Sequence, residues 1–159
     1  MISSYTRYVI AFFAALMLQS IFVPAIQIRG WKPDLVLIIL VIFALQHGKT
    51  AASTAGFFVG MSSDLLSWKL LGLGALTKTI SGYVAASVGR FLQDRNQFIL
   101  TLFITGFIHD LIFYFIITLG KEIVWRVLIF AQIIPNLLYT AILGIVINYF
   151  FGRWLAKNE

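Results

Sequence analysis

The stretch Leu35-Val36-Leu37-Ile38-Ile39-Leu40-Val41-Ile42-Phe43 is apolar at every position. A strand of a membrane barrel alternates apolar and polar residues over about ten positions, and this run does not alternate. In hydrocarbon every backbone amide needs a partner, and a helix supplies one within itself. The run therefore predicts a membrane-embedded helix.

Similar apolar segments of roughly bilayer-spanning length lie on both sides of this run, separated by short polar islands. They predict an all-α, polytopic transmembrane helical bundle of about six spans, forming one domain over residues 1–159. The segment that contains the run is short, so we expect Pro33 in its first helical turn and Asp34 at its N-terminus. The predicted spans are 8–28, 35–46, 50–66, 73–88, 97–119 and 127–151, and the first is expected to be a retained span rather than a cleaved signal peptide.

The composition excludes most soluble proteins. Hydrophobic residues make up 60% of the chain and charged residues 11%, whereas soluble domains have about half and about a quarter. The net charge is +6, but the basic residues are spread over every loop and form no patch that would suit nucleic acid. They are expected to anchor span ends to anionic membrane lipid. There is no cysteine, which excludes disulfides and thiolate metal sites.

The orientation follows from the number of spans rather than from charge. Six spans place both termini on one side, and we expect that side to be the cytoplasm. The 12 lysines and arginines then divide six to six between the two sides, or six to five if Lys78 lies within the fourth span, so the charge bias that normally marks the cytoplasmic side does not decide the orientation.

Gly56, Gly60 and Asp64 are spaced four residues apart and share one face of a helix. Small residues at this spacing allow another backbone to approach closely. The face is a candidate for docking a partner span. Packing inside the bundle is the favoured interpretation, and the two roles are compatible.

The segment 60–66 matches 106–112 at an offset of 46, pairing Gly60 with Gly106 and Asp64 with Asp110. The third and fifth predicted spans run in the same direction, so the match suggests a parallel internal repeat.

Asp64 and Asp110 lie at or near the ends of apolar segments, where a carboxylate is a functional candidate. The paired signatures of intramembrane aspartyl proteases are missing. A proton or ion relay remains an alternative for Asp110, because His109 adjoins it. The favoured interpretation is that each aspartate caps a helix or forms a pair, Asp64 with Lys69 or Lys78. No nucleophile has a base at a readable spacing and no metal-ligand spacing is present, so we predict no enzymatic activity, metal or cofactor.

The last predicted span contains Gln132, Pro135, Asn136 and Tyr139. Pro135 frees a backbone carbonyl and is expected to kink the helix. Gln132 and Asn136 lie four residues apart, on a face shared with Tyr139. This polar stripe suits either hydrogen bonds between helices, which is the favoured interpretation, or the lining of a cavity.

The chain resembles the MreD family of the bacterial rod-shape machinery over about residues 33–136. The resemblance rests on four motifs, which are Pro33-Asp34-Leu35, Gly56-Phe57-Phe58-Val59-Gly60-Met61-Ser62-Ser63-Asp64-Leu65-Leu66, the turn Leu71-Gly72-Leu73-Gly74-Ala75-Leu76, and Pro135-Asn136. It implies a non-enzymatic scaffold of cell elongation in the bacterial inner membrane. The implied partners are the single-span protein MreC and, indirectly, RodA, its penicillin-binding transpeptidase and MreB filaments.

The MreD fold is similar to the substrate-binding subunits of energy-coupling-factor vitamin transporters, and such a subunit is the alternative function. Those six-helix subunits dock a coupling protein through small residues of the first span, where this chain has Ala11 and Ala15. A vitamin site needs several converging polar groups, and the sequence shows no evident cluster of them.

Overall fold

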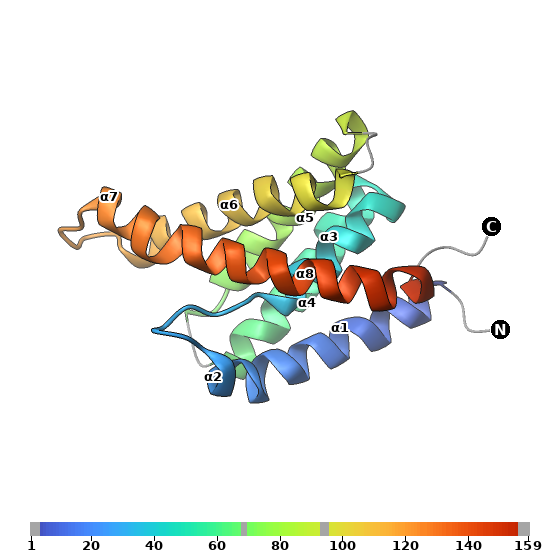
Figure 1. The fold of residues 1–159 in the computed structure, drawn as a ribbon, viewed down its shortest axis with the longest axis horizontal. Helices are drawn as coiled ribbons and strands as arrows, with labels where there is room; N and C mark the ends of the chain where they lie inside the picture. Colours follow the sequence, from blue (N-terminus) through green and yellow to red (C-terminus); the bar gives the residue numbers. More distant parts are fainter. Residues whose placement is uncertain (1–3, 68–69, 93–95, 156–159) are drawn as a thin grey trace.

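The computed structural model describes residues 4–67, 70–92 and 96–155, and these residues form a bundle of helices without a β-strand (Figure 1). The prediction of an all-α bundle is confirmed. The helices are α1 (Ser4–Ile21), α2 (Val23–Ile26), α3 (Leu35–His47), α4 (Lys49–Ser67), α5 (Leu73–Phe91), α6 (Gln97–Ile117), α7 (Trp125–Leu128) and α8 (Ile134–Leu155), and a π-helical turn, Ile129–Ile133, joins α7 to α8.

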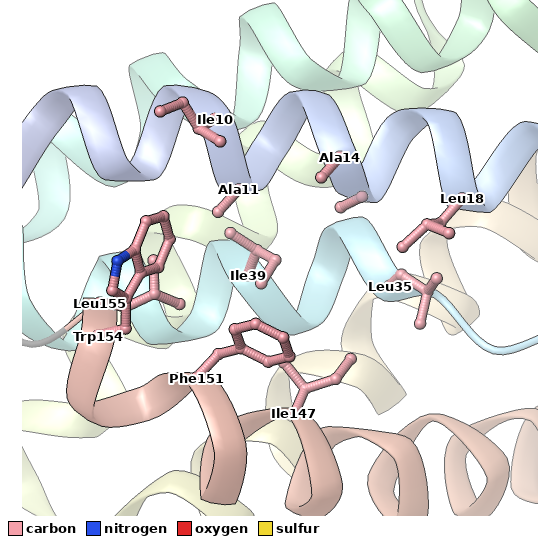
Figure 2. Close-up of a pocket in the computed structure, with 11 residues that line it drawn as sticks. Ile10, Ala11, Ala14, Leu18, Leu35, Ile39, Ile147, Phe151, Trp154 and Leu155 are labelled. Carbon is pink, nitrogen blue, oxygen red and sulfur yellow. The ribbon is translucent and has the colours of Figure 1, made fainter.

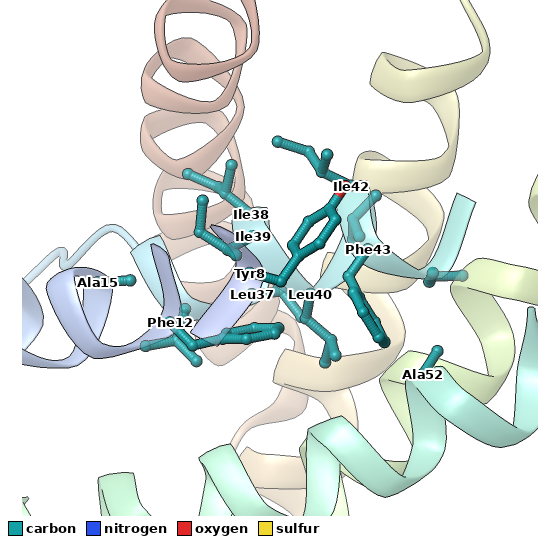
Figure 3. Close-up of a cluster of buried hydrophobic side chains, with 14 of the residues drawn as sticks. Tyr8, Phe12, Ala15, Leu37, Ile38, Ile39, Leu40, Ile42, Phe43 and Ala52 are labelled. Atoms are coloured by element: carbon teal, nitrogen blue, oxygen red, sulfur yellow. The ribbon is translucent and has the colours of Figure 1, made fainter. Parts of the chain in front are cut away.

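Helix α3 is the centre of the bundle. It contacts α1, α4, α5, α6 and α8, and residues 36–44 are all buried. A helix that is apolar all round is stable only where neighbours cover every face. Figure 3 shows Tyr8 and Phe12 of α1 beside Phe43 of α3, and the Tyr8 and Phe43 rings meet edge to face at 4.9 Å. The uninterrupted apolar run thus becomes the core.

The outer surface of the bundle is also apolar. Helix α6 exposes a stripe of large side chains with helical spacing, namely Leu100, Ile104, Phe107, Leu111 and Phe115. Such an exterior suits lipid rather than water. Among the described residues, Gln97–Ile117 and Trp125–Leu155 are long and apolar enough to cross a membrane. Tyr5–Ile21 and Leu35–His47 are apolar but shorter.

The structure differs from the predicted segments in the first span and at Pro33, and the last predicted span begins as α7 and a π-helical turn before α8. The first segment is divided at Phe22, and Pro24 lies in the first turn of the short helix α2. Helix α3 begins at Leu35, and Asp34 is its N-cap, accepting a hydrogen bond from the Leu37 amide at 2.9 Å. Pro33 therefore precedes the cap, and the prediction that it lies in the first helical turn is wrong.

The first and last long helices meet at one end of the bundle. The Arg7 guanidinium donates a hydrogen bond of 3.0 Å to the Trp154 carbonyl, and α1 and α8 diverge from that end (Figure 1). Helix α3 ends there too, because His47 contacts the Tyr5 ring in a tilted arrangement, with the ring centroids 5.0 Å apart. Asp34 consequently lies toward the opposite end.

Candidate functional site

Helices α4 and α5 are in backbone contact. A Cβ atom on Gly56 would collide with the Lys78 carbonyl, and one on Gly60 would collide with the Gly74 carbonyl. In the other direction, a Cβ on Gly82 would collide with the Ala52 carbonyl. The glycine face predicted from the sequence therefore lies against α5 of the same chain.

Asp64 sits at the end of this contact and caps α5. Its carboxylate accepts hydrogen bonds from the amides of Gly72 at 2.9 Å, Gly74 at 2.9 Å and Ala75 at 3.2 Å. These amides have no partner within the helix because they lie in its first turn. Lys78 does not pair with Asp64, and Lys69 lies outside the described residues.

Lys78 instead joins a cluster of ionisable side chains from three parts of the chain. Its Nζ lies 2.9 Å from Asp34 Oδ2 and 3.5 Å from His109 Nε2. The other ring nitrogen of His109 lies 3.0 Å from Asp110 Oδ1. Asp34 precedes α3, Lys78 belongs to α5, and the remaining two belong to α6. We call these four residues the ion cluster.

The ion cluster borders a cavity of about 140 Å³, which we call the polar cavity. Sequence reasoning singled out Asp64, Asp110 and Asn136 around it, but found no cluster of converging polar groups, and the structure corrects that expectation. Lys78, a lone lysine within the apolar segment 73–88, is the signal that could have revealed it. The cavity is lined by Gln19, Gly30, Lys32, Asp34, Ser63, Asp64, Ser67, Gly74, Thr77, Lys78, His109, Asp110, Phe113, Tyr114 and Asn136.

A second polar region surrounds Pro135. Proline has no amide hydrogen, so the Ala131 carbonyl four residues earlier cannot accept a helical hydrogen bond from position 135. The Trp31 indole donates to this carbonyl at 2.7 Å. The π-helical turn ends at Ile133, two residues before the proline, so the helix is irregular close to where the sequence predicted a kink.

The polar stripe of the last span holds the loop that precedes α3. Asn136 accepts a hydrogen bond from the Lys32 amide at 3.0 Å and donates one to the Tyr114 hydroxyl at 3.2 Å. The Tyr139 hydroxyl donates to the Ile26 carbonyl at 2.9 Å. Gln132 lies beside Gly30 of the same loop.

The two members of the suggested repeat have different surroundings. A Cβ on Gly106 would lie 2.6 Å from the Leu137 side chain of α8, whereas Gly60 faces the backbone of α5. Asp64 caps a helix, whereas Asp110 contacts a neighbouring histidine. The repeat stays a prediction from the sequence, without matching contacts.

An apolar groove of about 240 Å³ lies between α1 and α8, with α3 as its floor. Figure 2 shows the small side chains Ala11 and Ala14 on one wall and Ile147 and Phe151 on the other. Leu35 and Ile39 form the floor. We call this feature the α1–α8 groove.

A helical bundle with an apolar exterior and charged groups in its interior belongs to the class of helical membrane proteins. Residues 2–157 match the family described as rod shape-determining protein MreD, and the chain therefore belongs to the MreD family. The predicted resemblance is confirmed, and with it a place in the membrane and a role in determining rod shape. Comparison with curated proteins and with solved structures gives no match.

Proposed function

We propose that the protein is a non-enzymatic, multi-pass scaffold of the bacterial cytoplasmic membrane. It holds the single membrane span of an MreC-like partner and so supports the cell-elongation machinery, including RodA and its transpeptidase. The observation that carries this proposal is the α1–α8 groove, an unfilled apolar surface between α1 and the C-terminal part of α8.

The groove has the chemistry that a membrane helix requires. Its α1 wall carries Ala11, Ala14 and Ala15, and small residues let a second helix approach closely within lipid. The lining side chains are apolar along the described length of the groove. Association there depends on packing, because lipid offers no hydrophobic driving force between helices.

The docking faces expected from the sequence are already engaged inside the bundle. Gly56 and Gly60 lie against α5, and Asn136 bonds to the loop before α3 and to α6. This occupancy supports the α1–α8 groove as the partner's site in preference to either of those faces.

The small volume of the polar cavity favours a scaffold function over that of a vitamin-transporter subunit. Pockets for drug-sized ligands measure about 300–1,000 Å³, and the polar cavity measures about 140 Å³. A vitamin needs a larger space. Binding of a vitamin by the purified protein at nanomolar concentration, with normal cell shape after depletion, would establish the transporter function instead.

Site-specific crosslinking tests the docking site, because the chain has no cysteine of its own. We expect an Ala14→Cys variant to crosslink through a short bismaleimide to cysteines along one face of the partner's span. The matched control is Val9→Cys, on the same helix but exposed on its outer face, and it should not crosslink. Crosslinking at Val9→Cys but not at Ala14→Cys would contradict the groove as the docking site.

A groove-filling substitution tests the link to function. Ala11→Phe should reduce co-purification of the partner and give rounded cells, because the larger ring occupies the space of the partner helix. Val9→Phe adds a ring that faces lipid and should leave both unchanged. Full partner binding by a folded Ala11→Phe protein would show that the groove is not used.

A further inference from the structure

We propose that the polar cavity is a binding site for an ammonium group, with Asp110 as its counter-charge. The site is separate from the α1–α8 groove, so the proposal does not depend on the scaffold function. It rests on which charges in the cavity already have partners, on the aromatic rings beside the remaining charge, and on the size of the space.

Two of the three carboxylates in the cavity are already held by hydrogen-bond donors of the protein. Asp64 accepts hydrogen bonds from the first amides of α5. Asp34 pairs with Lys78 and accepts a further bond from the Leu37 amide. The Lys78 charge is used in this pair, and the Lys32 side chain lies at the exposed mouth, where solvent screens it.

Asp110 is the carboxylate left over. One of its oxygens lies 3.0 Å from the neighbouring His109 ring, and within the described residues its other oxygen has no hydrogen-bond partner. A carboxylate in the interior of a membrane bundle is costly unless it meets a cation. Asp110 therefore brings to the cavity a carboxylate oxygen that no donor of the described residues engages.

The rings of Phe113 and Tyr114 line the same cavity beside Asp110. Aromatic faces attract cations through the quadrupole of the ring, and ammonium groups are recognised by a carboxylate together with such faces. The Phe113 ring also stacks on His109, with the ring centroids 6.3 Å apart, so the rings supplement the Asp110 carboxylate, which by itself repels an anion. The arrangement therefore selects a cation.

The volume of the cavity limits the ligand to a small head group. A space of about 140 Å³ holds only about four or five water molecules at about 30 Å³ each. An ammonium group on a stem of two or three carbons fits this space. The head of an ethanolamine lipid and a free primary amine share this chemistry, and the test separates the two sources.

The two histidines of the chain make a direct readout available. His109 borders the polar cavity, whereas His47 stacks on Phe43 at the far end of α3. In protein labelled with ¹⁵N-histidine and held in phosphatidylglycerol nanodiscs, we expect millimolar ethylammonium to shift the His109 ring resonances saturably. The His47 resonances should not move, and sodium acetate at equal ionic strength should move neither.

Substitutions test whether Asp110 binds the ethylammonium that shifts the His109 resonances. Asp110→Asn should weaken the apparent affinity for ethylammonium by about tenfold or more, since it removes a charge-assisted contact. Phe113→Leu should weaken it to a smaller extent. The control is Glu122→Gln, which removes an exposed acidic group outside the cavity and should leave the titration unchanged.

Replacing part of the phosphatidylglycerol with phosphatidylethanolamine separates the two sources. If the lipid is the ligand, the His109 shift appears without added amine. If the ligand is a free amine, the lipid leaves His109 unchanged and ethylammonium still shifts it. The proposal is overturned if neither amine shifts His109, if acetate does so instead, or if Asp110→Asn binds ethylammonium as the native protein does.

Discussion

At the scale of single residues, two side chains supply hydrogen bonds to backbone groups that have no partner within their own helix. Pro135 leaves the Ala131 carbonyl without its helical donor, and Trp31, 100 positions before Ala131, donates to it at 2.7 Å. Asp64 likewise serves the free amides at the start of α5. The first contact fixes the loop before α3 against the last helix, and the second fixes α4 against the start of α5. Both form because an unpaired backbone group in an apolar setting is costly.

The Trp31 contact gives the first prediction. Trp31→Phe keeps a ring but removes the donor, so it should lower the free energy of unfolding by about 1 kcal/mol, measured by denaturation in detergent micelles. In a Pro135→Ala background the new amide at position 135 can serve the Ala131 carbonyl. In that background, the Trp31→Phe substitution should lower the free energy of unfolding by clearly less. Equal losses in both backgrounds would show that the two residues are not coupled.

At the scale of elements, small residues decide which helices can touch. Helices α4 and α5 carry Gly56, Gly60 and Gly82 at their contact, and each of these meets a carbonyl group of the facing helix. The two helices accordingly use polar and small side chains where α3 and α6 use large apolar ones. This explains why neither α4 nor α5 is among the helices with the strongest membrane-span composition.

The close contact gives a prediction about its tightest point. Gly60→Leu should destabilise the bundle by about 3 kcal/mol or more, because the side chain meets the backbone of α5 and cannot turn aside. Thermal denaturation in detergent measures the loss. Thr54→Leu, an exposed position on the same helix, adds a similar side chain and should cost less than about 0.5 kcal/mol.

Asp64→Asn provides a second comparison on the same helix. The amide keeps one accepting oxygen, so we expect a smaller loss than for Gly60→Leu, on the order of 1–3 kcal/mol. A native-like Gly60→Leu protein together with an unfolded Asp64→Asn protein would reverse this order. It would mean that the cap, rather than the close approach, holds α4 and α5 together.

At the scale of the whole molecule, the bundle surrounds α3, and the α1–α8 groove and the polar cavity both border the N-terminal part of this helix or its cap. The contact between Arg7 and Trp154 brings the two ends of the described chain to one end of the bundle. The ion cluster lies toward the other end, where Asp34 precedes α3. With both termini in the cytoplasm, the polar cavity would face the outer side of the membrane.

Reporter fusions test this topology. A phosphatase that is active only outside the cytoplasm should be inactive when fused after Asn96 or Glu159 and active when fused after Lys121. Fusions after Asn96 and Glu159 that report opposite sides would exclude six spans. If the fusions after Asn96 and Glu159 are active and the fusion after Lys121 is inactive, the protein has six spans in the opposite orientation.

The sequence by itself determined the class of the protein, the family and the approximate limits of the long helices. Apolar runs are local, and a membrane requires each of them to satisfy its own backbone. The Gly56–Gly60–Asp64 pattern was equally visible, since residues four apart share a helix face whatever lies opposite.

Only the tertiary structure decided which residues meet. Asp34, Lys78 and His109 are separated by more than thirty positions each, and no local pattern indicates that they form one cluster. The sequence suggested Lys78 as a partner of Asp64. In the structure, Asp64 accepts hydrogen bonds from the first amides of α5, and Lys78 pairs with Asp34. The α1–α8 groove also depends on how two distant helices diverge. Ion pairs and grooves arise from the relative placement of helices, which apolar periodicity does not specify because lipid and protein interior are equally apolar.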